Sequence, residues 1–189
     1  MATIATTTGE RLLTIDEYAR LPDNGTPTEL VRGRVITLNP PYPYHGYVCG
    51  NADHIIGGFA KQHDSGYVIT NDSGVVTERD PDTLRGADFA FYSYARVPKG
   101  TLAKRGYLTA IPDLIVEVRS PDDRWKDILT KVAEYLSAGV TVVCVLDPLR
   151  STATVYRADQ PEFTLSEDQE LAFPDVLPGF AVTVKRFFE

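Results

Sequence analysis

The chain has 189 residues, of which 43% are hydrophobic and 24% are charged, and its net charge at pH 7 is −7. This length is enough to bury a core within one domain, and the composition is typical of a globular protein. No apolar run approaches the length of a membrane span, and the first residues lack the pattern of a secretory signal, so we expect no membrane partner. Cys49 and Cys144 fall in segments that we predict to be buried, which favours free thiols in a cytoplasmic protein.

The charges are distributed unevenly along the chain. Six acids and no base occur over residues 159–175, whereas bases occur without any acid over residues 96–107. Net negative charge argues against nucleic-acid binding, because contact with phosphates requires a basic surface. Because the basic segment is the part of the chain that could still contact phosphates, it is the candidate DNA-binding region, with Lys99, Lys104 and Arg105 as its contact residues. A solvated loop that binds nothing is the alternative interpretation of the same composition.

The first third of the chain predicts two helices separated by strands. Residues 1–12 show no periodicity, and we expect a loose segment there, followed by a single domain over residues 13–189. Thr14 and Glu17 have the spacing of a capping box, which predicts a short helix to about Leu21. Strand-like residues follow over 30–38, and apolar residues then recur at helical spacing over 45–62.

The middle of the chain predicts three strands before its most informative segment. Two strands over 67–70 and 74–78 are predicted with Asn71-Asp72 as the turn between them, and a third strand over 87–92 carries Asp88. The run over 113–119 reads as a strand that is buried on both faces.

The last third begins with a helix. We expect Asp122 or Asp123 to cap it and Gly139 to end it. A buried strand over 141–146, a hairpin partner over 152–157 and edge strands in the tail complete the pattern. This order predicts an α/β fold in which helices flank a central mixed β-sheet, with added strands towards both ends of the chain.

Three acids are candidates for a metal site, because each lies at or within a predicted strand: Glu29, Asp88 and Glu117. A carboxylate in a buried strand is costly unless it is paired or coordinates an ion. Asp88 and Glu117 lie on strands that we predict to be neighbours, and two such carboxylates supply the oxygen ligands that Mg²⁺ prefers. An ion there would activate water for attack on a phosphodiester, and Glu29 could join through water. A structural ion pair at the strand end is the alternative.

A cation beside these acids would stabilise charge in the transition state. Arg119 lies two residues after Glu117 and is predicted to project to the same strand face, while Lys131 comes from the following helix. Asp113 shares that face too and is an alternative to Asp88. The three histidines are spaced by nine residues, which puts neighbours on opposite helix faces and predicts no shared metal site.

The ordered set of motifs resembles the Uma-type family of putative restriction endonucleases, a branch of the PD-(D/E)XK nuclease superfamily. The matching segments are Thr-Glu-Leu-Val-Arg-Gly-Arg-Val (28–35), Gly-Ala-Asp-Phe-Ala-Phe (86–91), Pro-Asp-Leu-Ile-Val-Glu-Val-Arg-Ser-Pro (112–121), Asp127, Lys131, Glu134-Tyr135, Ala138-Gly139-Val140 and Val145-Leu146-Asp147-Pro148. The resemblance covers residues 13 to 188. It implies a restriction-endonuclease-like core, Mg²⁺ as cofactor with Mn²⁺ as a substitute, and DNA as substrate.

The same resemblance implies roles for individual residues. Glu29 matches the first acid, Asp88 the motif aspartate and Glu117 the second metal acid, and His45 matches a position near the site. Arg119 stands where the superfamily motif has lysine. Because arginine is always charged and cannot act as a base, we rank Lys131 above Arg119 for the role of that lysine.

These patterns lead to three hypotheses about function. The first is a Mg²⁺-dependent endonuclease that hydrolyses DNA, acting as a homodimer with one site for each strand. The second is a catalytically inactive protein of nuclease fold that binds nucleic acid or a protein partner, which the net charge of −7 and the arginine at position 119 favour. The third is a metal hydrolase that acts on another phosphate ester.

Overall fold

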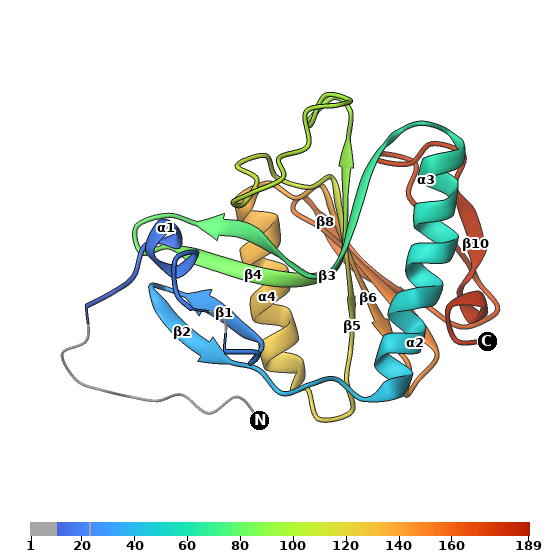
Figure 1. The fold of residues 1–189 in the computed structure, drawn as a ribbon. Coiled ribbons are helices and arrows are strands. Elements are labelled where there is room, and N and C mark those ends of the chain that lie inside the picture. The colour runs from blue at the N-terminus through green and yellow to red at the C-terminus, as the bar shows by residue number, and fades with distance from the viewer. Residues whose placement is uncertain (1–10, 23) are drawn as a thin grey trace.

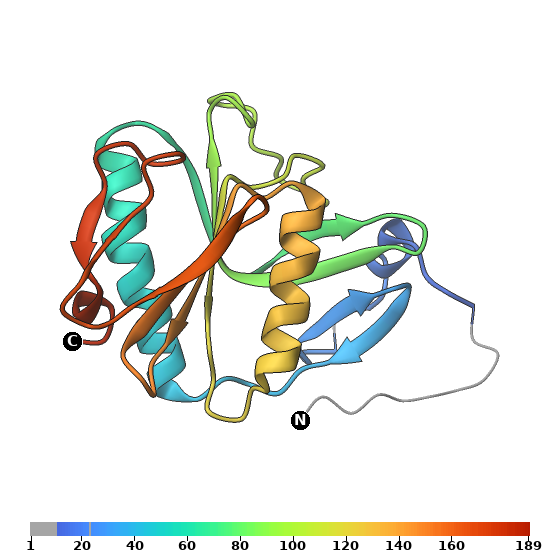
Figure 2. The ribbon, with the colours of Figure 1, turned by 180° about the vertical axis from the view of Figure 1, so that it is seen from behind.

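The computed structural model describes residues 11–22 and 24–189, and the expected loose segment over residues 1–12 lies almost entirely outside them. Within the described residues, a mixed eight-stranded sheet has the order β2-β1-β4-β5-β6-β7-β8, and β3 pairs with β4 beside this path. Helices α2 and α3 cover one face of the sheet and α4 covers the other (Figures 1 and 2). The predicted α/β class with a central mixed sheet is confirmed.

The N-terminal elements form a short helix and a hairpin. Helix α1 (Ile15–Tyr18) begins at the predicted capping box, since the Thr14 side chain accepts from the Glu17 backbone and the Glu17 side chain accepts from the Thr14 backbone. Strands β1 (Thr28–Val31) and β2 (Arg34–Thr37) are antiparallel. Their turn uses Gly33 at φ 73°, where a Cβ would lie 2.6 Å from that of Leu12. The hairpin therefore requires glycine at this turn.

Strands β3 (Gly66–Glu78) and β4 (Thr83–Ser93) form a long, bent antiparallel pair. The prediction of two strands separated by a turn at Asn71-Asp72 is wrong, because β3 continues through them as an irregularity in the ladder between Thr70 and Ser73. Asn71 and Asp72 have positive φ angles of 66° and 53°, which these residue types tolerate better than most, and the extra residue bends the strand.

The bend divides the pairing of β4 between two neighbours. Near its start, Leu84 pairs with Leu30 of β1, and near its end, Phe89 pairs with Val116 of β5 (Leu114–Val118). The first part of β4 therefore belongs to the β1–β2 end of the sheet, and the last part belongs to its centre (Figure 1). Asp88 lies just where the pairing with β5 begins.

Helix α4 (Trp125–Ala138) connects β5 to the parallel strand β6 (Val142–Asp147). It ends at Gly139 as predicted, with φ 101°. The predicted cap by Asp122 or Asp123 is wrong: the N-cap is Arg124, and the Asp123 carboxylate accepts instead from the Ser120 backbone at 2.8 Å. Local acids near a helix start have several backbone donors within reach, and the loop geometry chooses among them.

The remaining elements extend the sheet and cover one face. Strands β7 (Thr152–Arg157) and β8 (Gln160–Leu165) continue it to the edge, while β9 (Glu170–Ala172) and β10 (Ala181–Thr183) form a separate pair. The tail, ending in the 3₁₀ helix η2 (Val184–Phe187), packs with α2 (Pro43–Ala52), the π-helical turn η1 (Asp53–Gly57) and α3 (Gly58–Gln62). Most of the aromatic core lies in this layer.

Two expectations from composition can be compared with the fold. Cys49 and Cys144 are free thiols, and Cys144 is fully buried. Among the helices of the described residues, none is long and apolar enough to cross a membrane.

Candidate active site

Three buried acids come from three adjacent strands of the sheet. Glu29 lies in β1, Asp88 in β4 and Glu117 in β5, and their residues are 2%, 9% and 4% exposed. Continuing the β4–β5 register by one residue beyond Phe89 and Val116 puts Asp88 opposite Glu117. The charge of Asp88 contributes to the raised pKa of Glu117, so the fold brings these two acids near one another.

Lys131 of α4 connects two of the acids. Its Nζ lies 3.2 Å from Glu29 Oε1 and 3.3 Å from Glu117 Oε2, and it donates to the Gly86 carbonyl at 3.2 Å. Burial by itself disfavours the charge of Lys131, but the Glu117 and Glu29 carboxylates raise its pKa above the ordinary value. Lys131 is therefore a fixed cation between two strands at neutral pH.

Glu117 is the acid with the most perturbed ionisation. Burial raises its pKa to about 7, the Lys131 ammonium opposes this shift, and Asp88 adds to it. The Tyr135 hydroxyl donates to Glu117 Oε1 at 2.8 Å, so both carboxylate oxygens have a donor from α4. Such a carboxyl exchanges its proton near neutral pH and gains from a nearby cation.

Glu29 is held by a cluster that the sequence did not indicate. Arg85 donates to Glu29 Oε2 at 2.8 Å and makes a two-pronged contact with Glu134 of α4 at 2.6 and 2.9 Å. The Gly86 backbone donates to Glu29 Oε1 at 3.0 Å. Burial would raise the pKa of Glu29, but Lys131 and Arg85 lower it below its usual value. Glu29 is thus an ionised anchor for Lys131, and its oxygens are already occupied.

Asp88 is approached from the helix layer on the other face. Its Oδ2 accepts from the Val118 backbone at 2.7 Å and lies 3.4 Å from His45 Nε2. His45 Nδ1 lies 3.5 Å from Cys49 Sγ. Within the described residues, His45, Cys49 and Asp88 are the group whose ligand atoms all lie within 4.8 Å of one another. Sequence reasoning named His45 and missed Cys49, although the two are one helical turn apart.

Asp72 is a further acid of the site that the sequence analysis assigned to a turn. It lies at the irregularity of β3, and burial together with the charge of nearby Asp88 raises the pKa of Asp72. The signal was available in Asn71-Asp72, since such a pair inside a strand pattern is typical of a bulge as well as of a turn.

Comparison with known proteins decides the family. A family model described as "Uma2: Putative restriction endonuclease" matches residues 15–185 of this chain. The chain belongs to the Uma2 family. Among solved structures, the crystal structure of a putative nuclease of the DUF820 group from Anabaena variabilis superposes with a TM-score of 0.78 at 20% identity, covering 93% of this chain and 97% of that one. It is evidence for a shared fold. No curated protein matches.

The carboxylates of this Uma2 protein are of the residue type that holds hard divalent cations. Four acids, Glu29, Asp72, Asp88 and Glu117, surround two cations, Lys131 and Arg85, so the cluster has an excess of negative charge. Burial is the main cause of the raised pKa values of Asp72 and Glu117, and the charge of Asp88 adds to both shifts. Hard cations prefer carboxylate oxygens, and of these four acids Arg85 binds Glu29, which leaves Asp72, Asp88 and Glu117 without an arginine partner among the described residues.

Arg119, the other candidate cation of the site, forms its contacts outside the carboxylate cluster. It follows the last residue of β5, so the strand alternation that placed it beside Glu117 does not extend to it. Its guanidinium donates to Asp147 at 3.2 Å and to the Asp123 carbonyl at 3.2 Å, and lies 5.0 Å from the centre of the Trp125 ring. Arg119 therefore joins the ends of β5 and β6 to the start of α4.

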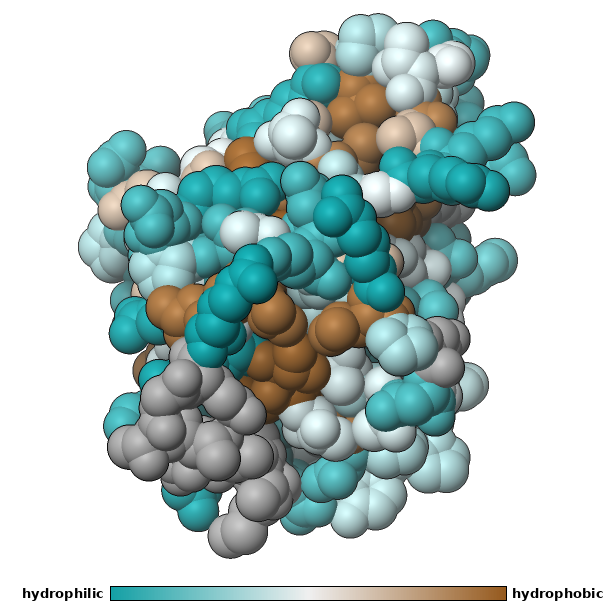
Figure 3. Space-filling model, turned by 60° about the vertical axis from the view of Figure 1, so that its left-hand side comes forward, coloured by the Kyte–Doolittle hydropathy of each residue, from teal (hydrophilic) through white to brown (hydrophobic). Residues whose placement is uncertain are grey.

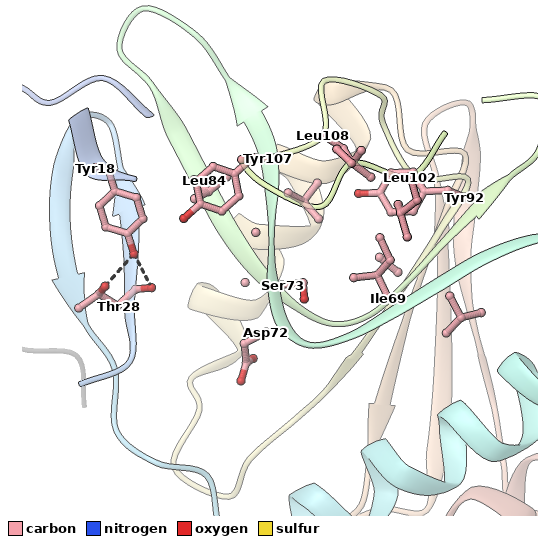
Figure 4. Close-up of a pocket in the computed structure, with 17 residues that line it drawn as sticks. Tyr18, Thr28, Ile69, Asp72, Ser73, Leu84, Tyr92, Leu102, Tyr107 and Leu108 are labelled. Atoms are coloured by element: carbon pink, nitrogen blue, oxygen red, sulfur yellow. Dashed lines mark hydrogen bonds between the residues drawn. The ribbon is translucent and has the colours of Figure 1, made fainter. Parts of the chain in front are cut away.

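The three basic residues proposed to contact DNA differ in whether they form an ion pair within the protein. Lys99 pairs with Asp64 at 2.6 Å, on an exposed surface. Lys104 and Arg105 are exposed and have no ion-pair partner among the described residues. Their loop lies over β3 and β4, since Leu102 and Tyr107 share a cavity with Ile69 and Tyr92 (Figure 4).

Proposed function

We propose that this protein is an endonuclease that hydrolyses DNA phosphodiester bonds at the carboxylate cluster, with Mg²⁺ or Mn²⁺ as cofactor. The observation that carries the proposal is the position of Lys131, within 3.3 Å of both Glu29 and Glu117 and in the same cluster as Asp88. Burying two acids and a lysine at a strand edge is weak evidence for stability, because the desolvation cost offsets the attraction. A functional reason for the arrangement is therefore favoured.

Each residue of the cluster has a role in this proposal. Asp88 and Glu117 hold the ion, which when bound activates water and offsets the charge of the phosphate. Lys131 stays protonated, because its pKa is raised, so it stabilises negative charge on the attacked phosphate and does not act as a base. Glu29 positions Lys131, and Arg119 has no catalytic role.

The test is cleavage of supercoiled plasmid by purified protein with Mg²⁺, Mn²⁺, Ca²⁺ or EDTA. We expect nicking with Mg²⁺ or Mn²⁺ and none with EDTA. Asp88→Asn and Glu117→Gln keep the side-chain shapes but remove the negative charges that hold the ion, so both variants should lose cleavage. Lys131→Gln should reduce kcat by about 10²–10³-fold, as removal of a transition-state donor does elsewhere.

Controls separate the enzyme from a contaminant. Asp175→Asn changes an acid that pairs with Arg157 outside the cluster, and it should cleave like the unaltered protein when purified in the same way. Cleavage that survives in Asp88→Asn and Glu117→Gln would show that another protein in the preparation is responsible. DNA binding without cleavage under every metal would favour the non-catalytic hypothesis, which the net charge of −7 supports.

We also propose that the active species is a homodimer, because cutting both strands of a duplex requires two sites of opposite orientation, and a twofold axis supplies them. Light scattering during gel filtration measures the mass directly. A monomer that nicks one strand would contradict the dimer and leave the nuclease proposal intact.

A further inference from the structure

A cavity of about 590 Å³ opens beside the carboxylate cluster, between the β3–β4 pair and the loop over residues 102–108. Ile69, Ser73 and Tyr92 line it from the strands, and Leu102, Tyr107 and Leu108 line it from the loop (Figure 4). Its volume lies within the range of about 300–1,000 Å³ that small-molecule sites occupy. When the side that carries β1 and β2 is turned forward, the surface shows apolar side chains in a recess bordered by hydrophilic ones (Figure 3).

Two hydroxyl groups in this cavity are unused. Tyr92 is 2% exposed, and among the described residues its hydroxyl and that of Tyr107 have no hydrogen-bond partner. By contrast, the Tyr18 hydroxyl contacts Thr28 at 2.8 Å, as Figure 4 shows. Neither hydroxyl oxygen is among the buried unpaired atoms of the described residues, so both hydroxyls are open to a polar ligand that enters the cavity. Burial raises the pKa of Tyr92 to about 12, so this hydroxyl remains a donor.

The cavity shares two residues with the cluster. Asp72 lines the cavity and neighbours Asp88. Gly86 also lines the cavity, and its backbone contacts both Glu29 and Lys131. The same loop that covers the cavity carries Lys104 and Arg105, two exposed bases without an ion-pair partner among residues 11–22 and 24–189. A ligand in the cavity therefore has an acid cluster at one end and positive charge at its rim.

We propose that this cavity receives one unstacked nucleobase of the DNA strand whose phosphate lies at the carboxylate cluster. The inference rests on the proposed function, because it assigns the cavity to that same substrate. A flat ring with polar edges fits walls of leucine, isoleucine and tyrosine that also offer free hydroxyls. Lys104 and Arg105 then contact flanking phosphates. Taking a base out of the stack is a known way for proteins to reach DNA, and it is easiest in mismatched or single-stranded regions.

The experiment uses duplexes with 2-aminopurine at successive positions, paired or mismatched, in Ca²⁺ buffer. The fluorescence of 2-aminopurine rises when the base leaves the stack, and we expect a rise at one position on binding. Leu102→Trp fills the cavity from a loop position that is 38% exposed. It should abolish the rise and weaken binding about 5- to 160-fold, the equivalent of one stacked base. Tyr107→Phe removes one hydroxyl and should weaken binding about 2- to 12-fold.

Leu149→Trp is the matched control, since Leu149 is 63% exposed in the turn after β6 and does not line the cavity. It should bind like the unaltered protein. Bound duplex without a rise at any position, or Leu102→Trp that binds normally, would overturn the inference. Deoxyadenosine monophosphate that binds as tightly as the duplex would assign the cavity to a free nucleotide and overturn the strand assignment.

This test does not depend on cleavage. If the fluorescence rises, Leu102→Trp abolishes the rise and the protein cuts no plasmid, the base site is supported and the nuclease proposal is rejected. Plasmid cleavage without any rise keeps the nuclease and rejects the base site.

Discussion

At the scale of single residues, Glu117 and Lys131 show how burial and charge set a site's chemistry. Glu117 has its pKa raised to about 7 by desolvation, whereas the pKa of Glu29 is lowered by Lys131 and Arg85 despite similar burial. The difference is the number of cations: Glu29 contacts Lys131 and Arg85, and Glu117 contacts Lys131 alone. Two acids of similar burial therefore receive different roles from their neighbours.

This difference predicts a pH-dependent affinity for the ion. Below pH 7 Glu117 is mostly protonated, and an ion must displace that proton, so affinity should fall by up to about tenfold per pH unit as the pH drops. Above pH 7 the carboxylate is ionised and the dependence should flatten. Calorimetry with Mn²⁺ from pH 5.5 to 8.5, in two buffers of different ionisation enthalpy, measures both the affinity and the released proton.

Glu117→Gln is the comparison for this titration, since it cannot release a proton. The variant should bind Mn²⁺ weakly at every pH, with a much flatter profile. An unaltered protein whose affinity is constant between pH 5.5 and 7 would contradict the assignment of Glu117 as a ligand.

At the scale of elements, Arg85 joins three of them. From β4 its guanidinium contacts Glu29 of β1 and Glu134 of α4, and it is 11% exposed. The first part of β4 pairs little with β1, because Leu30 and Leu84 are the one pair in register between the described residues of these strands. Side-chain contacts therefore supplement the backbone ladder at this junction, where the cluster is assembled.

Arg85→Met should lower the free energy of unfolding by about 3–5 kcal/mol, because it leaves Glu29 and Glu134 without their shared cation. Urea unfolding followed by circular dichroism measures the change. Arg150→Met is the control: it removes an arginine that is 70% exposed and 4.0 Å from Asp147, and should cost less than about 1 kcal/mol.

Adding Glu29→Gln and Glu134→Gln to Arg85→Met should restore part of the stability, since no buried charge is then left unpaired. A triple variant as unstable as Arg85→Met would show that Arg85 acts through packing of its stem.

At the scale of the whole molecule, charge is separated along the chain and in space. The acidic residues over 159–175 lie on β8, β9 and their turns, at the opposite end of the sheet from β1 and β2 (Figures 1 and 2). The loop with Lys104 and Arg105 lies over β3 and β4, beside the cluster. A protein with a net charge of −7 can therefore still present a basic rim to DNA.

Replacing Lys104 and Arg105 together by glutamine should weaken DNA binding and flatten its salt dependence, by about 0.9 in the log–log slope for each phosphate that the variant no longer neutralises. Lys99→Gln is the comparison, because Lys99 already pairs with Asp64 and should change the slope less. Fluorescence anisotropy across a salt series measures both. A slope that the double variant leaves unchanged would mean that this loop does not touch the DNA backbone.

Local sequence determined much of this protein. The capping box at Thr14 and Glu17, the end of α4 at Gly139 and the α/β class follow from patterns between near neighbours. A buried strand interrupted by Glu117 predicted a cation beside that acid, and the family resemblance favoured Lys131, whose Nζ lies 3.3 Å from Glu117 Oε2. Their catalytic roles remain predictions.

Only the tertiary structure decided the rest. Arg85 with Glu134, Asp72 with Asp88, and the cavity under Tyr107 all join segments far apart in the chain. Arg119 carried the strongest local signal, two residues from Glu117, yet the fold pairs it with Asp147. Periodicity fixes which face a residue occupies within its own element, but it does not extend past the element's end or specify which distant side chain lies opposite. Partners are chosen by strand pairing and helix packing, because a buried charge is stable only beside the group that the whole fold brings to it.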